Sequence, residues 1–283
     1  MANIRVIRRR IRSIQSTAKI TKAMEMVATS KMRRAQERVL AGRPYAEKIQ
    51  QVLADLAAQQ GSSVHPLLER REVNRVQVIH ITADRGLCGG LNTNMNRSTA
   101  TFILEQVAPI VLITVGRKGR EFMLRYGRDV RAEFTGISDR PSLLDTVPIS
   151  RIVIDDYTSG LVDRVYLAYT RFVTTMTQRP VVQQLLPVEP ARMERGGEIE
   201  YIYEPTSRVV LAELLPRFVE MEVYHAILES IASEQSTRMV AMRNATENAN
   251  EMIEDLTLVY NKVRQEMITR ELLDITGGAE ALV

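Results

Sequence analysis

The chain has 283 residues, 45% hydrophobic, 25% charged and 5% aromatic, a composition typical of a folded protein. Its net charge is +4, and its one cysteine, Cys88, excludes an internal disulfide framework and a cysteine-rich zinc site. The sequence contains no apolar run of the about 18 residues that a membrane-spanning helix needs, and no apolar signal core at its start, so we expect a soluble or peripheral protein.

The charge is distributed unevenly along the chain. Residues 1–48 contain 13 of the 38 basic and 3 of the 34 acidic residues, a net charge of +10, and the remainder carries −6. A basic arm on an acidic body indicates an anionic partner, which can be a nucleic acid, a membrane surface or an acidic protein surface. A solvated helix face is the simpler alternative.

The first 57 residues have the repeat of a coiled-coil helix. From Ile4 to Leu56, 13 of the 16 positions in alternating 3- and 4-residue steps are apolar, and the exceptions are Thr21, Glu25 and Gly42. We expect a helix over residues 2–57, with a kink at Pro44, that ends before Gly61.

Strands alternate with helices in the middle of the chain. We expect strands at 76–81, 110–115, 129–134, 164–172 and 181–186, and helices at 92–107, 117–126 and 142–158. This order predicts a mostly parallel, doubly wound sheet, that is, a Rossmann-like α/β domain. Residues 187–206, rich in proline and glycine, are expected to form a linker or an irregular hairpin.

The last third of the chain repeats the coiled-coil pattern. From Met221 to Leu273, 12 of 16 stripe positions are apolar, and the exceptions are Gln235, Arg238, Glu266 and Arg270. We expect a helix from Ser207 that tolerates Pro216 and stops at Gly277-Gly278.

Neither long helix is stable in water with an unpaired apolar stripe. The sequence therefore predicts an antiparallel two-helix coiled coil joined by the α/β domain, an α+β or α/β arrangement overall. The second helix is longer, so about 20 Å of it would protrude with an apolar tip that needs a covering protein. The predicted division is 1–60 (coiled-coil helix), 74–190 (α/β domain), 191–206 (linker) and 207–283 (coiled-coil helix).

Readings of the middle region as an enzyme find little support. The glycine turn Asp84–Asn92 lacks the G-x-G-x-x-G spacing of dinucleotide sites, and Gly116–Gly119 lacks the P-loop spacing, so we expect structural turns with Asp84 capping backbone N–H groups. None of the three histidines is placed in the sequence as a base for Cys88, and metal ligands do not cluster. We therefore expect no cofactor, metal or catalytic residue.

The segment Ile20–Arg34 departs from the coiled-coil stripe. Ile20, Ala23, Met24, Met26 and Val27 spread apolar surface around the helix, which a water-exposed two-helix coil does not need. Packing against the middle of the chain is one interpretation. The other is contact with a surrounding protein, to which methionine offers soft, adaptable surface.

Several long segments carry a family resemblance. The run Ile20–Arg34, the turn Asp84–Asn92 and the stretches Ser233–Met242, Leu258–Gln265 and Ile268–Ala279 resemble the gamma subunit of F-type ATP synthases. The resemblance is collinear and covers nearly the whole chain. It implies a non-catalytic rotor shaft that transmits rotation of the membrane c-ring to three catalytic β subunits, coupling hydrogen ion transport to ATP synthesis or its reverse.

The resemblance also implies partners and contact residues. The partners are the ring of α and β subunits, the epsilon subunit and the c-ring, without nucleic acid, and the location is the cytoplasmic face of a bacterial cell membrane. Residues implied to contact the catalytic ring are Lys19, Lys22, Met24, Glu25, Met26, Val27, Arg33, Arg34, Arg238, Gln265, Leu282 and Val283. Tyr201, Tyr203 and Glu204 are implied to contact the c-ring or epsilon.

Two other functions stay open at this point. A basic coiled-coil module that binds nucleic acid would explain the charged arm, although the arm lacks interleaved aromatic residues for base stacking. A Rossmann-type enzyme with helical extensions would explain the α/β pattern, and saturable cofactor binding by residues 74–190 would support it.

Overall fold

The computed structural model describes residues 4–59, 65–189, 203–204 and 206–280. The chain divides into two compact units, Met1–Ala28 with Met239–Val283, and Thr29–Arg238. Helices α1 (Ile4–Gln59) and α5 (Ser207–Glu280) each contribute to both units, which are described separately below. No helix of the described residues combines the length and the apolar character that crossing a membrane requires.

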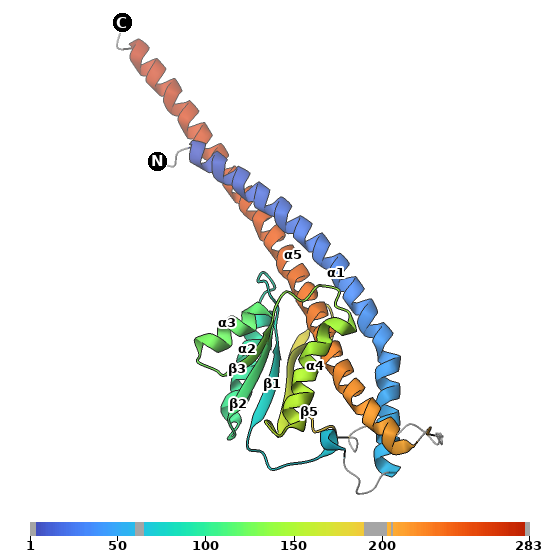
Figure 1. Ribbon diagram of the computed structural model, residues 1–283. Coiled ribbons are helices and arrows are strands. Elements are labelled where there is room, and N and C mark those ends of the chain that lie inside the picture. Colours follow the sequence, from blue (N-terminus) through green and yellow to red (C-terminus); the bar gives the residue numbers. More distant parts are fainter. Residues whose placement is uncertain (1–3, 60–64, 190–202, 205, 281–283) are drawn as a thin grey trace. The chain divides into compact units, whose positions relative to one another are not determined.

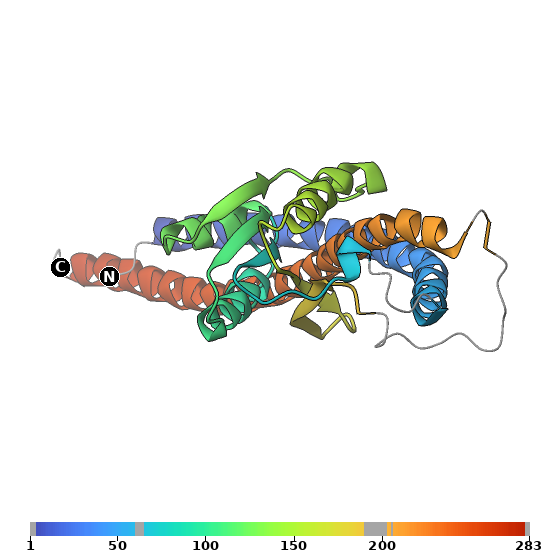
Figure 2. The same ribbon diagram turned by 60° about the horizontal axis from the view of Figure 1, so that its bottom comes forward.

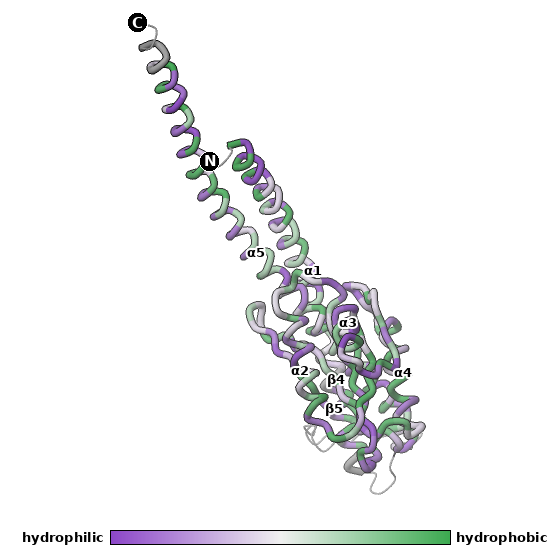
Figure 3. The backbone as a smooth tube through the Cα atoms, turned by 90° about the vertical axis from the view of Figure 1, so that its left-hand side faces the viewer, coloured by the Kyte–Doolittle hydropathy of each residue, from purple (hydrophilic) through white to green (hydrophobic). Residues whose placement is uncertain are grey.

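The first unit consists of the N-terminal part of α1 and the C-terminal part of α5, which run antiparallel side by side (Figure 1). Apolar residues recur along both helices (Figure 3). Ile7, Ala18 and Ala28 of α1 and Met242 and Ala249 of α5 are buried. The predicted pairing of the two ends of the chain is therefore confirmed.

The second unit is built on one five-stranded sheet of order β3-β2-β1-β4-β5. Its strands are β1 (Val76–Ile81), β2 (Ile110–Val115), β3 (Val130–Phe134), β4 (Arg164–Phe172) and β5 (Gln178–Leu186). Its other helices are η1 (Pro66–Leu68), α2 (Leu91–Glu105), α3 (Arg117–Arg125) and α4 (Leu143–Thr158). Strands β1 to β4 pair in parallel, and β5 is antiparallel to β4, so the Rossmann-like prediction is confirmed.

Helices cover both faces of this sheet (Figures 1 and 2). On one face, Val76 and Val78 of β1 pack with Met95 of α2 and Met123 of α3. On the other, the alternate residues Ile79 and Ile81 join a larger core that includes α4 and parts of α1 and α5. Residues of α1 and α5 in this core include Leu53, Leu56, Leu215, Val219 and Val223. The period-2 alternation of β1 thus separates two cores, because successive strand side chains point to opposite faces.

Local sequence explains several element boundaries. Ser142 and Asp145 form a capping box that starts α4, in which Ser142 N donates to Asp145 Oδ2 at 2.7 Å. Pro180 lies in β5, an edge strand, where a missing N–H is tolerated. Pro216 lies inside α5 without ending it.

Several boundaries differ from the sequence prediction, most by one or two residues. Helix α5 continues through Gly277 and Gly278 to Glu280, because glycine costs a helix only about 1 kcal/mol and is no obligatory stop. Strand β5 begins at Gln178, before Pro180, and α2 ends at Glu105 rather than at residue 107. The predicted linker lies largely outside the described residues, which omit 190–202 and 205.

Candidate functional site

The paired helices of the first unit are joined by polar contacts at the positions that interrupt the apolar stripe. Thr21 Oγ1 lies 2.7 Å from Thr246 Oγ1 across the helix pair, and the hydroxyl of Thr246 also donates to Met242 O. Four residues from Thr21, Glu25 accepts hydrogen bonds from Lys22 at 2.9 Å and from Arg243 at 3.2 Å. Two of the three exceptions in the first stripe are therefore inter-helix contacts.

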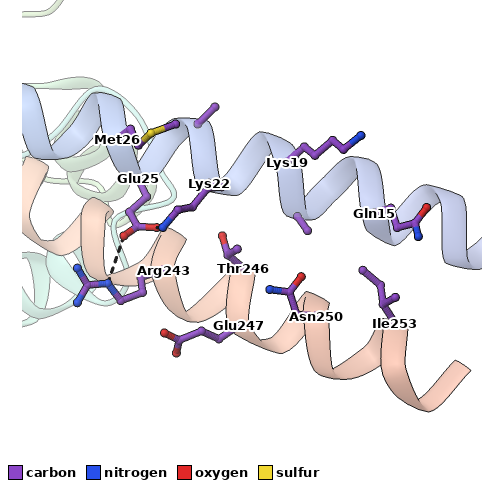
Figure 4. A pocket seen from close by; sticks show the side chains of 12 residues that line it. Gln15, Lys19, Lys22, Glu25, Met26, Arg243, Thr246, Glu247, Asn250 and Ile253 are labelled. Carbon is purple, nitrogen blue, oxygen red and sulfur yellow. Dashed lines mark hydrogen bonds and ion pairs between the residues drawn. The ribbon is translucent and has the colours of Figure 1, made fainter. Parts of the chain in front are cut away.

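Glu25 is the electrostatic centre of this arrangement. It is buried, and its pKa lies below the ordinary value because Lys22 donates to it and Arg243 adds a second positive charge, against the opposing effect of burial. Both cations are about half exposed, so their remaining N–H groups stay available to an external partner. In Figure 4, Glu25 and Arg243 point toward one another from the two helices.

A groove runs beside this ion pair between the two helices (Figure 4). It is lined by Gln15, Ala18, Lys19, Lys22, Ala23, Glu25, Met26, Arg243, Thr246, Glu247, Asn250 and Ile253. Its lining is mixed in charge and holds both Lys19 and Lys22 at its rim, where an acidic group of another chain would meet two cations.

Part of the apolar surface of α1 is exposed. Ile20, Met26 and Val27 are 60%, 61% and 54% exposed, respectively, whereas Met24 is half-buried. Burying such side chains against a partner is favourable at about 25 cal/mol per Å². The helix therefore presents apolar side chains and lysines together on its outer surface.

The described end of α5 continues as an exposed helix. Val263 is half-buried, and every residue from Arg264 to Thr276 is exposed. Its apolar side chains include Met267, Ile268, Leu272, Leu273 and Ile275, which are 43–69% exposed. In Figure 1 this stretch of α5 extends past the N-terminal end of α1. A helix with this much exposed apolar surface requires another protein to cover it.

The remaining residues of the implied ring contact lie in different surroundings. Lys19, Arg33, Arg34 and Gln265 are exposed, and Leu282 and Val283 lie outside the described residues. Arg238 has its guanidinium largely buried, where it donates to Gly86 O at 3.2 Å and to Glu234 at 2.7 Å. The structure therefore brings together Lys19, Lys22, Glu25 and Met26 around one groove.

The implied c-ring or epsilon contacts are described only in part. Tyr203 is half-buried and packs against the larger core, and Glu204 is exposed. Tyr201 lies outside the described residues.

The glycine turn of the α/β domain is structural. Asp84 accepts hydrogen bonds from Arg117 N at 2.9 Å and from Gly136 N at 2.8 Å, which ties together the loops after β1, β2 and β3. The predicted capping by Asp84 is therefore confirmed, although the capped amides belong to other loops.

The reactive side chains of this domain are sequestered. Cys88 is buried, and burial raises the pKa of its thiol, which disfavours the nucleophilic thiolate. His80 is buried and hydrogen-bonds to Asn96 and Thr99, and burial lowers its pKa to about 4. Among the described residues, no group of three or more His, Cys, Asp or Glu is placed to hold a metal ion.

Sequence reasoning missed the partners on α5. Arg243, Thr246 and Asn250 complete the groove, yet they lie more than 200 residues along the chain from the α1 residues that they face. The signal that could have pointed to them is the break in the first stripe at Thr21 and Glu25, because a polar residue at a buried position needs a partner.

Comparisons with known proteins decide between the open functions. The family model described as ATP synthase matches residues 3–282. The chain is 64% identical over 284 residues to the ATP synthase gamma chain of Dehalococcoides mccartyi, with full coverage of both, and 48% identical over 293 residues to that of Herpetosiphon aurantiacus, with 100% of this chain and 99% of the relative covered. The chain belongs to the ATP synthase gamma chain family.

Solved structures agree with this assignment. The chain is similar to a central-stalk chain of the Tetrahymena thermophila mitochondrial ATP synthase, with a TM-score of 0.63 and 27% identity over 80% of this chain and 99% of that one. A chain of the Euglena gracilis mitochondrial ATP synthase has the same fold, with a TM-score of 0.69 and 21% identity over 99% of this chain and 94% of that one.

The family assignment identifies a non-catalytic stalk subunit that acts as a rotor shaft. It replaces the interpretations as a nucleic-acid-binding module and as a Rossmann-type enzyme, and it confirms the resemblance seen in the sequence. The groove and the exposed helix end are thus surfaces of a gamma chain.

Proposed function

We propose that this gamma chain passes rotation of a membrane c-ring to the three catalytic β subunits of a ring of α and β subunits, with epsilon attached to its α/β domain. Proton flow then drives ATP synthesis, and ATP hydrolysis drives the reverse. The support is full-length similarity to gamma chains, together with a solved relative described as a central stalk with its c-ring.

One observation carries the contact with the ring. From Arg264 to Thr276, α5 is exposed on every side and displays five large apolar residues. Such a helix is unsuited to water and suited to an apolar sleeve, in which contacts are non-directional. A rotating shaft needs this kind of contact, because directional hydrogen bonds at one angle would hold it there.

The charged groove makes the interaction energy between shaft and ring depend on the rotation angle, which an apolar sleeve alone does not. Lys19 and Lys22 lie beside exposed Met26, and Arg33 and Arg34 are exposed farther along α1. Acidic groups on β subunits would be attracted to these cations at some angles and not at others. We infer that the β subunits exchange force with this side of α1, both when ATP hydrolysis turns the shaft and when the shaft drives ATP synthesis.

The other end of the shaft is assigned by resemblance. Tyr203 and Glu204, with Tyr201, are proposed to face the c-ring or epsilon, and Glu204 is exposed as such a contact requires. The organisms of the two gamma-chain relatives support a location on the cytoplasmic face of a bacterial cell membrane. The division into 1–60, 74–190, 191–206 and 207–283 remains a proposal.

A reversible cross-link tests the shaft role. Val27→Cys, which is 54% exposed in the wild-type chain, is joined by a disulfide to a cysteine on a β subunit in the assembled complex. Multi-site ATP hydrolysis is expected to stop and to return on reduction, because the shaft can no longer turn. Leu104→Cys, on α2 and 74% exposed, serves as the unlinked control. Full steady-state hydrolysis with a verified cross-link would overturn the proposal.

A further inference from the structure

Helix α5 carries a row of buried polar side chains where it passes the β4–β5 hairpin. Ser230, Ser233 and Ser236 follow one another at three-residue spacing, so they lie on neighbouring positions of one helix face. Ser233 and Ser236 are fully buried, and Ser230 is 9% exposed. Buried hydroxyls need partners, and all three find them outside their own helix.

The first two serines complete the backbone hydrogen bonding of Thr170 in β4. Ser233 Oγ donates to Thr170 O at 3.1 Å, and Thr170 N donates to Ser230 Oγ at 3.4 Å. The ladder between β1 and β4 ends at Ala168, two residues before Thr170. Helix α5 thus supplies hydrogen-bond partners at a point where the sheet is short of them.

The third serine reaches the turn of the same hairpin. Ser236 Oγ donates to Thr175 O at 2.7 Å, and Gln178 Nε2 donates to Ser236 Oγ at 3.4 Å. The stretch of α5 from Ser230 to Ser236, about two helical turns, is therefore bonded to the end of β4, to the turn and to the start of β5.

These bonds differ in kind from the contacts of α5 on either side. Toward the N-terminus of the helix, Val219, Val223 and Ile227 pack into the apolar core, and toward its C-terminus Ile268 and Leu272 are exposed. Apolar contact resists separation but permits sliding, since it is non-directional, whereas a hydrogen bond weakens steeply when its angle changes. A domain that turns a helix has to be held against sliding.

We propose that Ser230, Ser233 and Ser236 hold α5 in a fixed register on the α/β domain and thereby pass torque from that domain to the shaft. The proposal rests on the rotor function. The serines are positioning residues, which act through the stiffness of the joint between the domain and the helix.

Hydrogen exchange on the full chain gives the first test. In Ser233→Ala/Ser236→Ala, amides of residues 170–178 are expected to exchange about tenfold faster than in the wild type, equivalent to about 1.4 kcal/mol. The matched control is Ser150→Ala, which removes a fully buried hydroxyl that bonds only to carbonyls of its own helix, α4. Equal exchange in the double variant and the wild type would overturn the proposal.

Rotational stiffness of the assembled complex gives the second test. The ring of α and β subunits is fixed to a surface, and a probe is attached at Leu144→Cys on α4, a position that is 79% exposed. The angular spread of the probe at rest then measures the stiffness of the joint between the α/β domain and α5. Cys88 is 1% exposed and is spared by the label. We expect the double variant to lose rotational stiffness while ATP hydrolysis persists. Ser150→Ala is expected to keep the stiffness of the wild type.

The outcomes separate the two proposals. Rotation of the wild-type complex in this assay tests the rotor function itself. Unchanged stiffness in the double variant, or an equal loss in Ser150→Ala, overturns the register role and leaves the rotor function intact. If the double variant fails to assemble, Ser236→Ala alone, which loses the shortest of the bonds, is measured in its place under the same criteria.

Discussion

The carboxylate of Glu25 accepts a hydrogen bond from Arg243 across the two paired helices, at 3.2 Å. Lys22 donates to the other oxygen of the same carboxylate at 2.9 Å. Glu25 is thereby the meeting point of two helices from opposite ends of the chain, and a residue that breaks the apolar stripe of α1 becomes a contact that sets the register of the pair.

Replacing Glu25 tests this contact through its pH dependence. The pKa of Glu25 is lowered in the folded chain, so its contribution to stability is fully present above the unfolded pKa of 4.5 and is lost as the pH falls through the folded pKa. Glu25→Gln is expected to cost about 1 kcal/mol at pH 7, since both cations are about half exposed, and nothing below the folded pKa. Urea unfolding across this range measures it.

The matched control for this variant is Glu254→Gln, which removes an exposed carboxylate from α5. It should leave stability nearly unchanged at both ends of the pH range. A cost of Glu25→Gln that does not shrink as the pH falls below 4.5 would contradict the ion-pair account.

His80 predicts a second pH dependence, in the α/β domain and of the same sign. Its imidazole is buried and its pKa is about 4, against 6.5 when unfolded, so the unfolded chain binds a proton over this range and the folded chain does not. Stability is therefore expected to fall by about 3 kcal/mol between pH 6.5 and pH 4 on this account. In His80→Gln the dependence of the unfolding free energy on pH over that range should become weaker. An unchanged dependence would mean that other groups cause it.

Gly116 is expected to tolerate no side chain. Its φ is +96°, and a Cβ there would lie 2.1 Å from the backbone oxygen of Thr82. Strain and overpacking together predict a loss of about 3 kcal/mol or more in Gly116→Ala. Gly127 also has positive φ, +64°, but open space around it, so Gly127→Ala should cost only about 1 kcal/mol. Thermal unfolding of both variants separates crowding from backbone strain.

Cys88 should react slowly with thiol reagents. It is 1% exposed, and burial raises the pKa of its thiol, so the thiolate is scarce at neutral pH. Labelling of the native chain at pH 7.5 is expected to be far slower than labelling in urea. Equal rates in both conditions would show that the turn after β1 opens freely.

Met24→Lys tests the coupling role of the outer surface of α1. Met24 is half-buried beside exposed Met26 and Val27, and a lysine there would add a persistent ion pair with an acidic partner. We expect ATP hydrolysis to continue while ATP-driven proton pumping per ATP falls, measured in membrane vesicles. Leu104→Lys adds the same charge on α2 of the α/β domain and should pump normally. Unchanged pumping in Met24→Lys would count against this picture of the shaft.

The sequence by itself determined the elements, because their signals are local. The 3-4 apolar stripe located α1 and α5, and the alternation of strands and helices predicted the parallel sheet, since both patterns depend on residues a few positions apart. The family resemblance rested on the same local strings. The exposed apolar end of α5 followed from the difference in length between the two helices.

Only the tertiary structure decided what the breaks in the stripes are for. Thr21 meets Thr246, Glu25 meets Arg243, and a Cβ at Gly42 would lie 2.4 Å from the ring of His225. On α5, Gln235 donates to Asp139 and Arg238 to Gly86 O. These partners lie from about 100 to more than 200 residues apart, and which of them meet depends on the register of packed helices and on the loops beside them. That register results from side-chain packing over the whole chain, which no local window of sequence contains.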